Sequence, residues 1–198
     1  EWIAYISDAT GEDEIFIISH GGKGETVQLT TKGNNYKFSI AWSPNSKKII
    51  WYDRMQRLHF VDVETKKVTL VDKAEASAIY SYAWSPDSRY IVYTRPEIRS
   101  NARIYIYSLE QEKSIPVTDS WYSSSSPEFS ADGKYLFFIS QRTFTPRYGA
   151  LEFNHIYTDM SNVYMITLAK DTKSPFAPKS DETAITEFLD ENKDALVL

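Results

Sequence analysis

One eleven-residue pattern occurs three times in this chain at a nearly constant interval. Residues 41–51 read AWSPNSKKIIW, residues 83–93 read AWSPDSRYIVY, and residues 128–138 read EFSADGKYLFF. The aromatic residues that lead the copies are Trp42, Trp84 and Phe129, so the intervals are 42 and 45 residues. Repeats of about 40 to 45 residues with four short strands each are typical of β-propeller blades. The spacing therefore predicts stacked or radially arranged units.

Each copy has the pattern of a strand, a tight turn and a second strand. In the middle copy, Pro86 presets φ for the turn, and Asp87 and Ser88 can bond back to the local backbone. The residues seven and nine positions after each leading aromatic are apolar, and positions two apart share one face of a strand. These pairs are Ile49 and Trp51, Ile91 and Tyr93, and Leu136 and Phe138. Each copy is therefore predicted to form a hairpin with one buried face.

The repeat divides the chain into an all-β, partial propeller of about four antiparallel blades. We expect the blades at about 1–38, 39–80, 81–124 and 125–172, inside a propeller domain that covers 1–178. Residues 2–7 overlay the second strand of the unit, so the first unit's leading aromatic would lie before Glu1, and the chain is expected to be cut from a longer protein. The tail, 179–198, is expected to be a linker toward a downstream region, with a short helix from about 182 to 189.

A polar and aromatic insertion, residues 141–162, interrupts the fourth unit. Connections of this length are often functional or pack as a loop of their own. Arginine and aromatic side chains are common in binding hot spots. We therefore predict a contact surface here or, alternatively, a loop that folds onto its own blade. The candidate contact residues are Arg142, Phe144, Arg147, Tyr148, His155 and Tyr157.

Composition excludes several classes of partner and site. The formal net charge is −5 and no basic block is present, so nucleic acid is not an expected partner. The chain has no cysteine, which excludes disulfides and thiolate metal sites and suits the cytoplasm, with the periplasm as the alternative. No apolar run approaches the roughly 18 residues that a membrane helix needs, so membrane insertion is not expected.

Residues that could carry chemistry are few. The three histidines fall in separate segments, the serine run 123–126 leads into a strand, and no Gly-x-Ser-x-Gly pattern occurs. The acidic cluster within 8–14 lacks the glycine and the terminal glutamate of a calcium loop. The leading aromatics fit core positions better than a carbohydrate platform, because they recur at the blade period. We therefore assign no catalytic, cofactor-binding or metal-binding residue, and expect no cofactor.

The repeats resemble those of TolB-type propellers, which are found in TolB, in prolyl oligopeptidase-like enzymes and in tricorn proteases. The C-terminal third is more specific. Its segments 126–129, 133–146, 164–168 and 174–178 resemble the end of the second, seven-bladed propeller of tricorn protease and its bacterial homologues.

This resemblance implies a role without chemistry of its own. Tricorn-like enzymes are self-associating serine proteases that degrade oligopeptides, and their catalytic region follows the propellers. The chain would then serve peptide access, gating or assembly, with peptides as substrates of the parent enzyme and self-association expected. Four blades cannot close a ring sized for seven, so the faces of the first and last blades should be exposed. The alternatives are a TolB-like interaction propeller without protease activity and the propeller of a prolyl oligopeptidase-like hydrolase.

Overall fold

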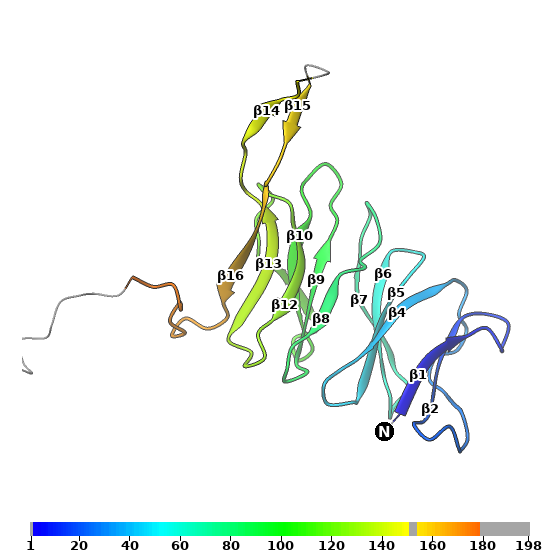
Figure 1. The fold of residues 1–198 in the computed structure, drawn as a ribbon. Coiled ribbons are helices and arrows are strands. Elements are labelled where there is room, and N and C mark those ends of the chain that lie inside the picture. The colour runs from blue at the N-terminus through cyan, green and yellow to red at the C-terminus, as the bar shows by residue number, and fades with distance from the viewer. Residues whose placement is uncertain (1, 151–153, 179–198) are drawn as a thin grey trace, which may run out of the picture.

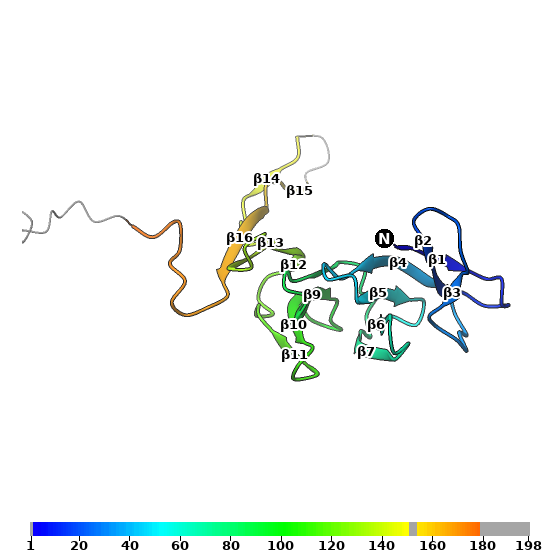
Figure 2. The same ribbon diagram turned by 90° about the horizontal axis from the view of Figure 1, so that it is seen from below.

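The computed structural model describes residues 2–150 and 154–178. Throughout these residues the regular structure consists of strands, which form five antiparallel sheets, and no helix occurs. Four of the sheets follow one another side by side in an open arc (Figure 1). Seen from below, they radiate, with β7 and β11 on the outside of the arc (Figure 2). The predicted all-β partial propeller is confirmed.

The second and third sheets each contain four strands in chain order. The strands of the second sheet are β4 (Lys37–Trp42), β5 (Lys48–Asp53), β6 (Arg57–Asp62) and β7 (Val68–Lys73). Those of the third are β8 (Tyr82–Trp84), β9 (Tyr90–Arg95), β10 (Arg103–Ser108) and β11 (Lys113–Pro116). The sequence copies at 41–51 and 83–93 thus supply the first two strands of each sheet.

The first and fourth sheets contain three strands each. The first is formed by β1 (Trp2–Ser7), β2 (Glu14–Ser19) and β3 (Val27–Gln28). The fourth is formed by β12 (Ser124–Phe129), β13 (Tyr135–Gln141) and β16 (Ser161–Thr167). Between β13 and β16, the insertion forms a hairpin of its own from β14 (Pro146–Tyr148) and β15 (His155–Tyr157). The helix predicted at 182–189 lies outside the described residues.

The turn after each leading aromatic has the same hydrogen bonds in all three copies. In the third sheet, the hydroxyl of Ser85 donates to Asp87 at 2.6 Å and accepts from the Tyr90 amide at 2.9 Å. The second and fourth sheets repeat both bonds around Ser43 and Ser130. This local network fixes the turn. The predicted local bond of Asp87 is present, from the Arg89 amide at 3.1 Å, but Ser88 accepts from the Asn45 amide of the neighbouring turn instead.

The core lies between adjacent sheets rather than at one centre. One cluster joins the first and second sheets, one joins the second and third, and one joins the third and fourth. Trp42, Trp84 and Phe129 each pack into the cluster that faces the preceding sheet. The apolar pairs of the second strands have the same orientation, and Ile91 and Tyr93 are wholly buried. Equivalent positions therefore occupy equivalent environments, as a radial repeat requires.

The two end faces of the arc are uncovered by the described residues. On the first sheet, Ile3 is 49% exposed, and on the fourth, Val163 is 71% exposed. Phe137 and Ile139 lie on the same open face as Val163, because the register pairs Ile139 with Val163. The expected exposure of the terminal blade faces is thus present in the structure.

Candidate interaction surface

The insertion hairpin carries aromatic side chains on one of its two faces. The register pairs Pro146 with Tyr157 and Tyr148 with His155, so these four side chains share a face. The rings of Tyr148 and His155 are 4.8 Å apart, and those of His155 and Tyr157 are 6.4 Å apart. Phe144 extends the row, with its ring 5.6 Å from that of Tyr157. We call these five residues the aromatic ladder.

The aromatic ladder is open to solvent. Phe144 is 70% exposed and Tyr148 is 72% exposed. In Figure 1 the hairpin of β14 and β15 projects beyond the edge of the arc, away from the sheets. Of the two alternatives left open by the sequence, a contact surface and a loop folded onto its own blade, this geometry favours the contact surface.

The two arginines predicted for this surface lie elsewhere. Arg142 packs against the fourth sheet, with its guanidinium 4.3 Å from the ring centre of Tyr164 and 5.5 Å from that of Tyr122. Its Nε donates to the hydroxyl of Ser140 at 3.3 Å. Arg147 pairs in register with Ile156, so it lies on the face of the hairpin opposite to the aromatic ladder. The structure thus brings four of the six predicted residues together, namely Phe144, Tyr148, His155 and Tyr157.

Further exposed aromatic residues share the edge of the arc from which the hairpin rises. At this edge the chain enters β4, β8 and β12, and Tyr36, Tyr80 and Trp121 lie just before these strands. Trp121 is 81% exposed, and the other two are also exposed. We call this edge the aromatic rim, and the opposite edge, which holds the three Ser-led turns, the turn rim. The repeat pattern did not identify these three residues, which lie between four and eight residues before a leading aromatic.

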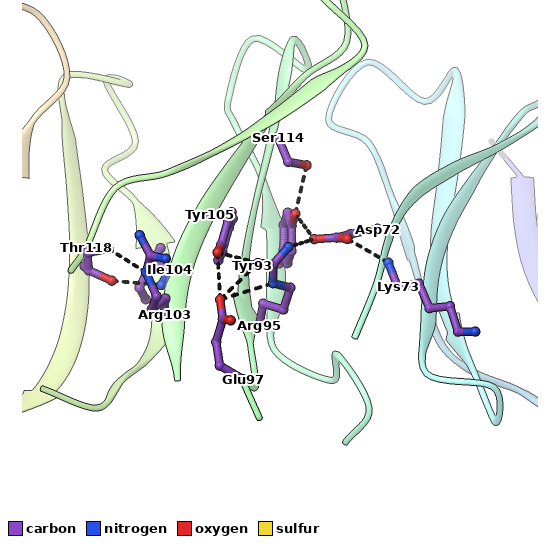
Figure 3. Close-up of polar contacts among 10 residues, drawn as sticks. All are labelled: Asp72, Lys73, Tyr93, Arg95, Glu97, Arg103, Ile104, Tyr105, Ser114 and Thr118. Carbon is purple, nitrogen blue, oxygen red and sulfur yellow. Dashed lines mark hydrogen bonds and ion pairs between the residues drawn. The ribbon is translucent and has the colours of Figure 1, made fainter. Parts of the chain in front are cut away.

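A polar network crosses the boundary between the second and third sheets near the aromatic rim (Figure 3). Arg95, at the end of β9, donates to Asp72 on β7 at 3.1 Å and to Glu97 at 3.0 Å. Its guanidinium carbon lies 4.0 Å from the ring centre of Tyr105. The hydroxyl of Tyr105 donates to Glu97 at 2.7 Å. Arg95 is thus held by two carboxylates and a ring, which fixes the start of the loop 96–102.

Hydrogen bonds and burial together set the protonation of this network. Burial tends to raise the pKa of Glu97, but the Tyr105 hydroxyl and Arg95 outweigh it, so the pKa is lowered and the carboxylate stays charged. Burial, with the charge of Asp72, raises the pKa of Tyr93, so its phenol stays protonated. The described partners satisfy every charge in the network, and we interpret it as a clamp between sheets rather than a reactive centre.

Three of the other residues considered for chemistry have structural contacts. His59 stacks on Trp51 with ring centres 5.4 Å apart. In the serine run, the hydroxyl of Ser124 is buried and donates to that of Ser140 at 3.1 Å. Glu14 accepts from the Gly33 amide at 2.6 Å and lies 3.2 Å from the Lys37 ammonium.

The pKa of Glu14 shows how this carboxylate is held. Burial tends to raise the pKa, but the hydrogen bonds from Thr30, Gly33 and Lys37 outweigh it and lower the pKa.

No group of three or more histidine and carboxylate side chains within the described ranges is placed to bind a metal ion. The same ranges contain no helix that is long and apolar enough to cross a membrane.

The fold and the repeated turns define a class. Radiating antiparallel sheets, joined by clusters that bury equivalent residues, are the blades of a β-propeller. Within that class, residues 1–196 match the family model of the tricorn protease second β-propeller domain. The chain belongs to this family.

Individual relatives agree with the family match. The chain is 29% identical over 174 residues to a tricorn-like protease C-terminal subunit from Sulfurisphaera tokodaii, covering 88% of this chain and 20% of that protein. A crystal structure of tricorn protease superposes with a TM-score of 0.78 at 23% identity, covering 88% of this chain and 17% of the other. A TolB structure from Agrobacterium tumefaciens gives 0.54 at 19% identity, covering 84% and 57%. The chain thus spans about a fifth of the length of the curated tricorn relatives it matches.

Proposed function

We propose that this chain is the non-catalytic propeller part of a tricorn-like serine protease, where it serves peptide access, gating or assembly for a catalytic region elsewhere. The observation that carries the proposal is the family match over residues 1–196. Relatives named as tricorn proteases support it, and peptides are then the substrates of the parent enzyme. We place this function in the cytoplasm and expect the parent protein to self-associate.

Within this role, we assign to the aromatic ladder the contact with a peptide or with another part of the protease. A two-stranded hairpin leaves the outer edges of both strands unpaired, and such edges can accept an additional strand. Aromatic side chains bury a large area at low cost in conformational entropy, which suits them to binding. The contact is either with a peptide that enters the arc or with another part of the assembled protease.

A ladder variant tests the proposal and separates the two contacts. In the full-length protein, Phe144→Ala combined with Tyr148→Ala should reduce peptide hydrolysis, assembly, or both. Reduced hydrolysis with an unchanged mass by light scattering would assign the ladder to peptide access, and a reduced mass would assign it to assembly. Wild-type hydrolysis together with wild-type mass would contradict the role of the ladder. Arg147→Ala, on the opposite face of the hairpin, is the matched control.

The catalytic assignment has a separate test. The 198-residue chain alone should not hydrolyse peptides. Turnover that a single serine substitution in this chain abolishes would overturn the non-catalytic role.

A TolB-like interaction propeller, with the periplasm as its compartment, is the second candidate. The structural likeness to TolB, which shows a shared fold only, is the reason to retain this second candidate. The two candidates differ in the sequence that the parent gene encodes after Leu198. A PDZ-like segment with a serine hydrolase region supports the protease, whereas an immediate stop codon supports the interaction propeller.

A further inference from the structure

A cleft of 480 Å³ lies between the third and fourth sheets at the turn rim. Its apolar wall includes Ile106, Ile115, Phe129 and Leu168, and its mouth is lined by Asp87 and other turn residues. This volume is within the range of about 300 to 1,000 Å³ that is usual for small-ligand sites. The cleft is on the opposite edge of the arc from the aromatic ladder, so it is a distinct site.

The repeat explains why a cleft occurs between these two sheets. The register pairs Phe60 with Ile50 in the second sheet and Ile106 with Val92 in the third, so Ile106 occupies the position of Phe60. In the preceding interface, the ring of Phe60 lies 6.1 Å from that of Trp84 and 6.3 Å from that of Tyr107. These three aromatic side chains fill the space there.

Smaller side chains stand at the equivalent positions of the next interface. Ile106 replaces Phe60, Phe129 replaces Trp84, and Ile166 replaces Tyr107, because Ile166 pairs with Leu136 as Tyr107 pairs with Ile91. Two of these residues, Ile106 and Phe129, line the cleft, and the smaller side chains there leave the space open. The cleft is therefore a product of the side chains that the sequence places in this interface.

The turns of this interface lack a side chain that ties the turns of the preceding interface together. Between the second and third sheets, the Asn45 amide donates to the hydroxyl of Ser88 at 3.1 Å and ties neighbouring turns together. The residue equivalent to Ser88 in the fourth sheet is Gly133, which has no side chain to accept such a bond. Gly133 has φ +69° and Ser88 has φ 60°, so the backbone conformation is shared while the hydroxyl is lost. This difference leaves the mouth of the cleft open.

The charge at the mouth is negative. Asp132 has Lys134 3.6 Å away, and Arg89 pairs with Glu110 at 3.4 Å. Asp87 has no salt bridge within the part of the chain that the structure describes. One of its oxygens accepts from Ser85 and from the Arg89 amide, at 2.6 and 3.1 Å. Burial tends to raise the pKa of Asp87, but these hydrogen bonds and the charge of Arg89 outweigh it and lower the pKa, so the group is a carboxylate at neutral pH.

We propose that this cleft binds a short peptide that inserts an apolar side chain against Ile106 and Phe129 and places an adjacent basic group at Asp87. The apolar wall favours burial of an aliphatic side chain. The unpaired carboxylate at the mouth favours a lysine, an arginine or a free amino terminus over a neutral or acidic group. This inference goes beyond the proposed function, because it concerns the turn rim and holds for a protease or an interaction propeller alike.

Methyl NMR of isoleucine in the full chain can test the cleft directly. The probes are acetyl-Leu-Leu-Lys-amide and acetyl-Leu-Leu-Gln-amide, which differ in one charge. Both peptides should shift the methyl signals of Ile106 and Ile115 in a saturable way, and the lysine peptide should bind more tightly. The signal of Ile49, which is wholly buried in the first interface, is the internal reference.

Two variants copy residues that the repeat already uses at the same positions. Asp87→Asn reproduces Asn45 and should weaken the lysine peptide by about three- to fivefold, as for a partly exposed ion pair, with no change for the glutamine peptide. Ile106→Phe reproduces Phe60 and should weaken both peptides more than tenfold, by filling the cleft.

Clear outcomes would overturn the proposal. One is the absence of saturable shifts at Ile106 and Ile115 at millimolar peptide concentration. That result would mean that the cleft does not bind peptides, whether or not another segment of the protein occupies it. Another is binding that both variants leave unchanged. If Ile106→Phe disturbs folding, as judged by near-UV circular dichroism, the comparison of the two peptides on Asp87→Asn still decides.

Discussion

The phenol of Tyr93 on β9 donates a hydrogen bond of 2.6 Å to the carboxylate of Asp72 on β7, across the boundary between two blades. Ser114 lies 2.8 Å from the same phenol oxygen, and because the phenol has one proton, Ser114 is the donor in that second bond. Asp72 also accepts from Arg95. One carboxylate on the outer strand of the second blade thus ties that blade to two residues of strand β9 in the third.

Removing the Tyr93 hydroxyl should loosen this boundary. In Tyr93→Phe, Asp72 keeps Arg95 but loses a short, charge-assisted bond, so we expect the free energy of unfolding to fall by about 1 to 3 kcal/mol. Chemical denaturation of the two proteins measures the difference. Tyr80→Phe, on an exposed ring of the aromatic rim, is the control and should change stability by less than about 0.5 kcal/mol. Equal stability of Tyr93→Phe and the wild type would refute the interblade role of this bond.

Acidification should weaken the second blade through Asp62. The hydrogen bond from Lys48, helped by the Thr65 amide, lowers the pKa of Asp62 from 3.8 to about 2. Because the folded-state pKa is below the unfolded value, the stabilisation is fully present above about pH 4 and is lost as the pH falls toward 2. The free energy of unfolding should therefore fall more steeply with acid in the wild type than in Asp62→Asn. Parallel curves between pH 5 and 2 would contradict this assignment.

His59 should add a second pH dependence at milder acidity. Burial lowers its pKa below 6.5, against the opposing charge of Asp53, so the imidazole that stacks on Trp51 is neutral at pH 7. The unfolded chain then binds the proton more readily, and the contribution of this group to stability is lost as the pH falls below about 6.5. In His59→Phe the fall in unfolding free energy between pH 7 and 5 should be smaller. The ring stack is retained in that variant, so a steeper fall would rule out a neutral buried His59.

The repeat made much of this architecture predictable. Because the leading aromatic and the apolar pair recur at a fixed offset, the sequence located the hairpins and the buried face of residues such as Ile91 and Tyr93. The sequence pattern predicted strands at 39–42, 48–52, 57–63 and 67–71 in the second unit and at 81–84, 90–94, 103–109 and 114–118 in the third. The observed strands differ from these by one or two residues at their ends. Such differences are expected, because side-chain alternation does not mark where pairing stops. The blade boundaries themselves stay a prediction.

The candidate surface was harder to predict from sequence. Three-residue strands such as β14 and β15 are too short to show a period of two, so the faces of Arg147 and Tyr148 could not be separated. The position of Arg142 depends on Tyr122 and Tyr164, which reach it only after the fourth sheet has formed. The ion pair between Asp72 and Arg95 likewise depends on how neighbouring blades pack against each other. The local sequence pattern does not specify that packing.

The leading aromatic of the third blade should be a stability determinant, not a binding residue. Trp84 is 9% exposed and its indole N–H is buried without a hydrogen-bond partner among the described residues. Trp84→Ala should lower the free energy of unfolding by about 3 to 5 kcal/mol. Trp84→Phe reproduces the residue at the equivalent position 129 and removes the unpaired donor, so its cost should be well below that of the alanine variant. Equal losses in the two variants, measured by chemical denaturation, would show that ring packing is not what Trp84 supplies.

Arg142 and Arg147 are a matched pair of arginines with which a stabilising role can be distinguished from a role in surface contact. Both arginines are exposed, but Arg142 lies against the rings of Tyr122 and Tyr164 and donates to Ser140, whereas Arg147 lies on the hairpin. Because the guanidinium of Arg142 lies against aromatic rings while the residue stays exposed, Arg142→Ala should lower the free energy of unfolding by about 0.5 to 1 kcal/mol. Arg147→Ala should stay within about 0.5 kcal/mol of the wild type. If thermal and chemical denaturation gave the reverse order, Arg142 would have to lie on the hairpin surface, and the separation of the fourth blade from its insertion would be wrong.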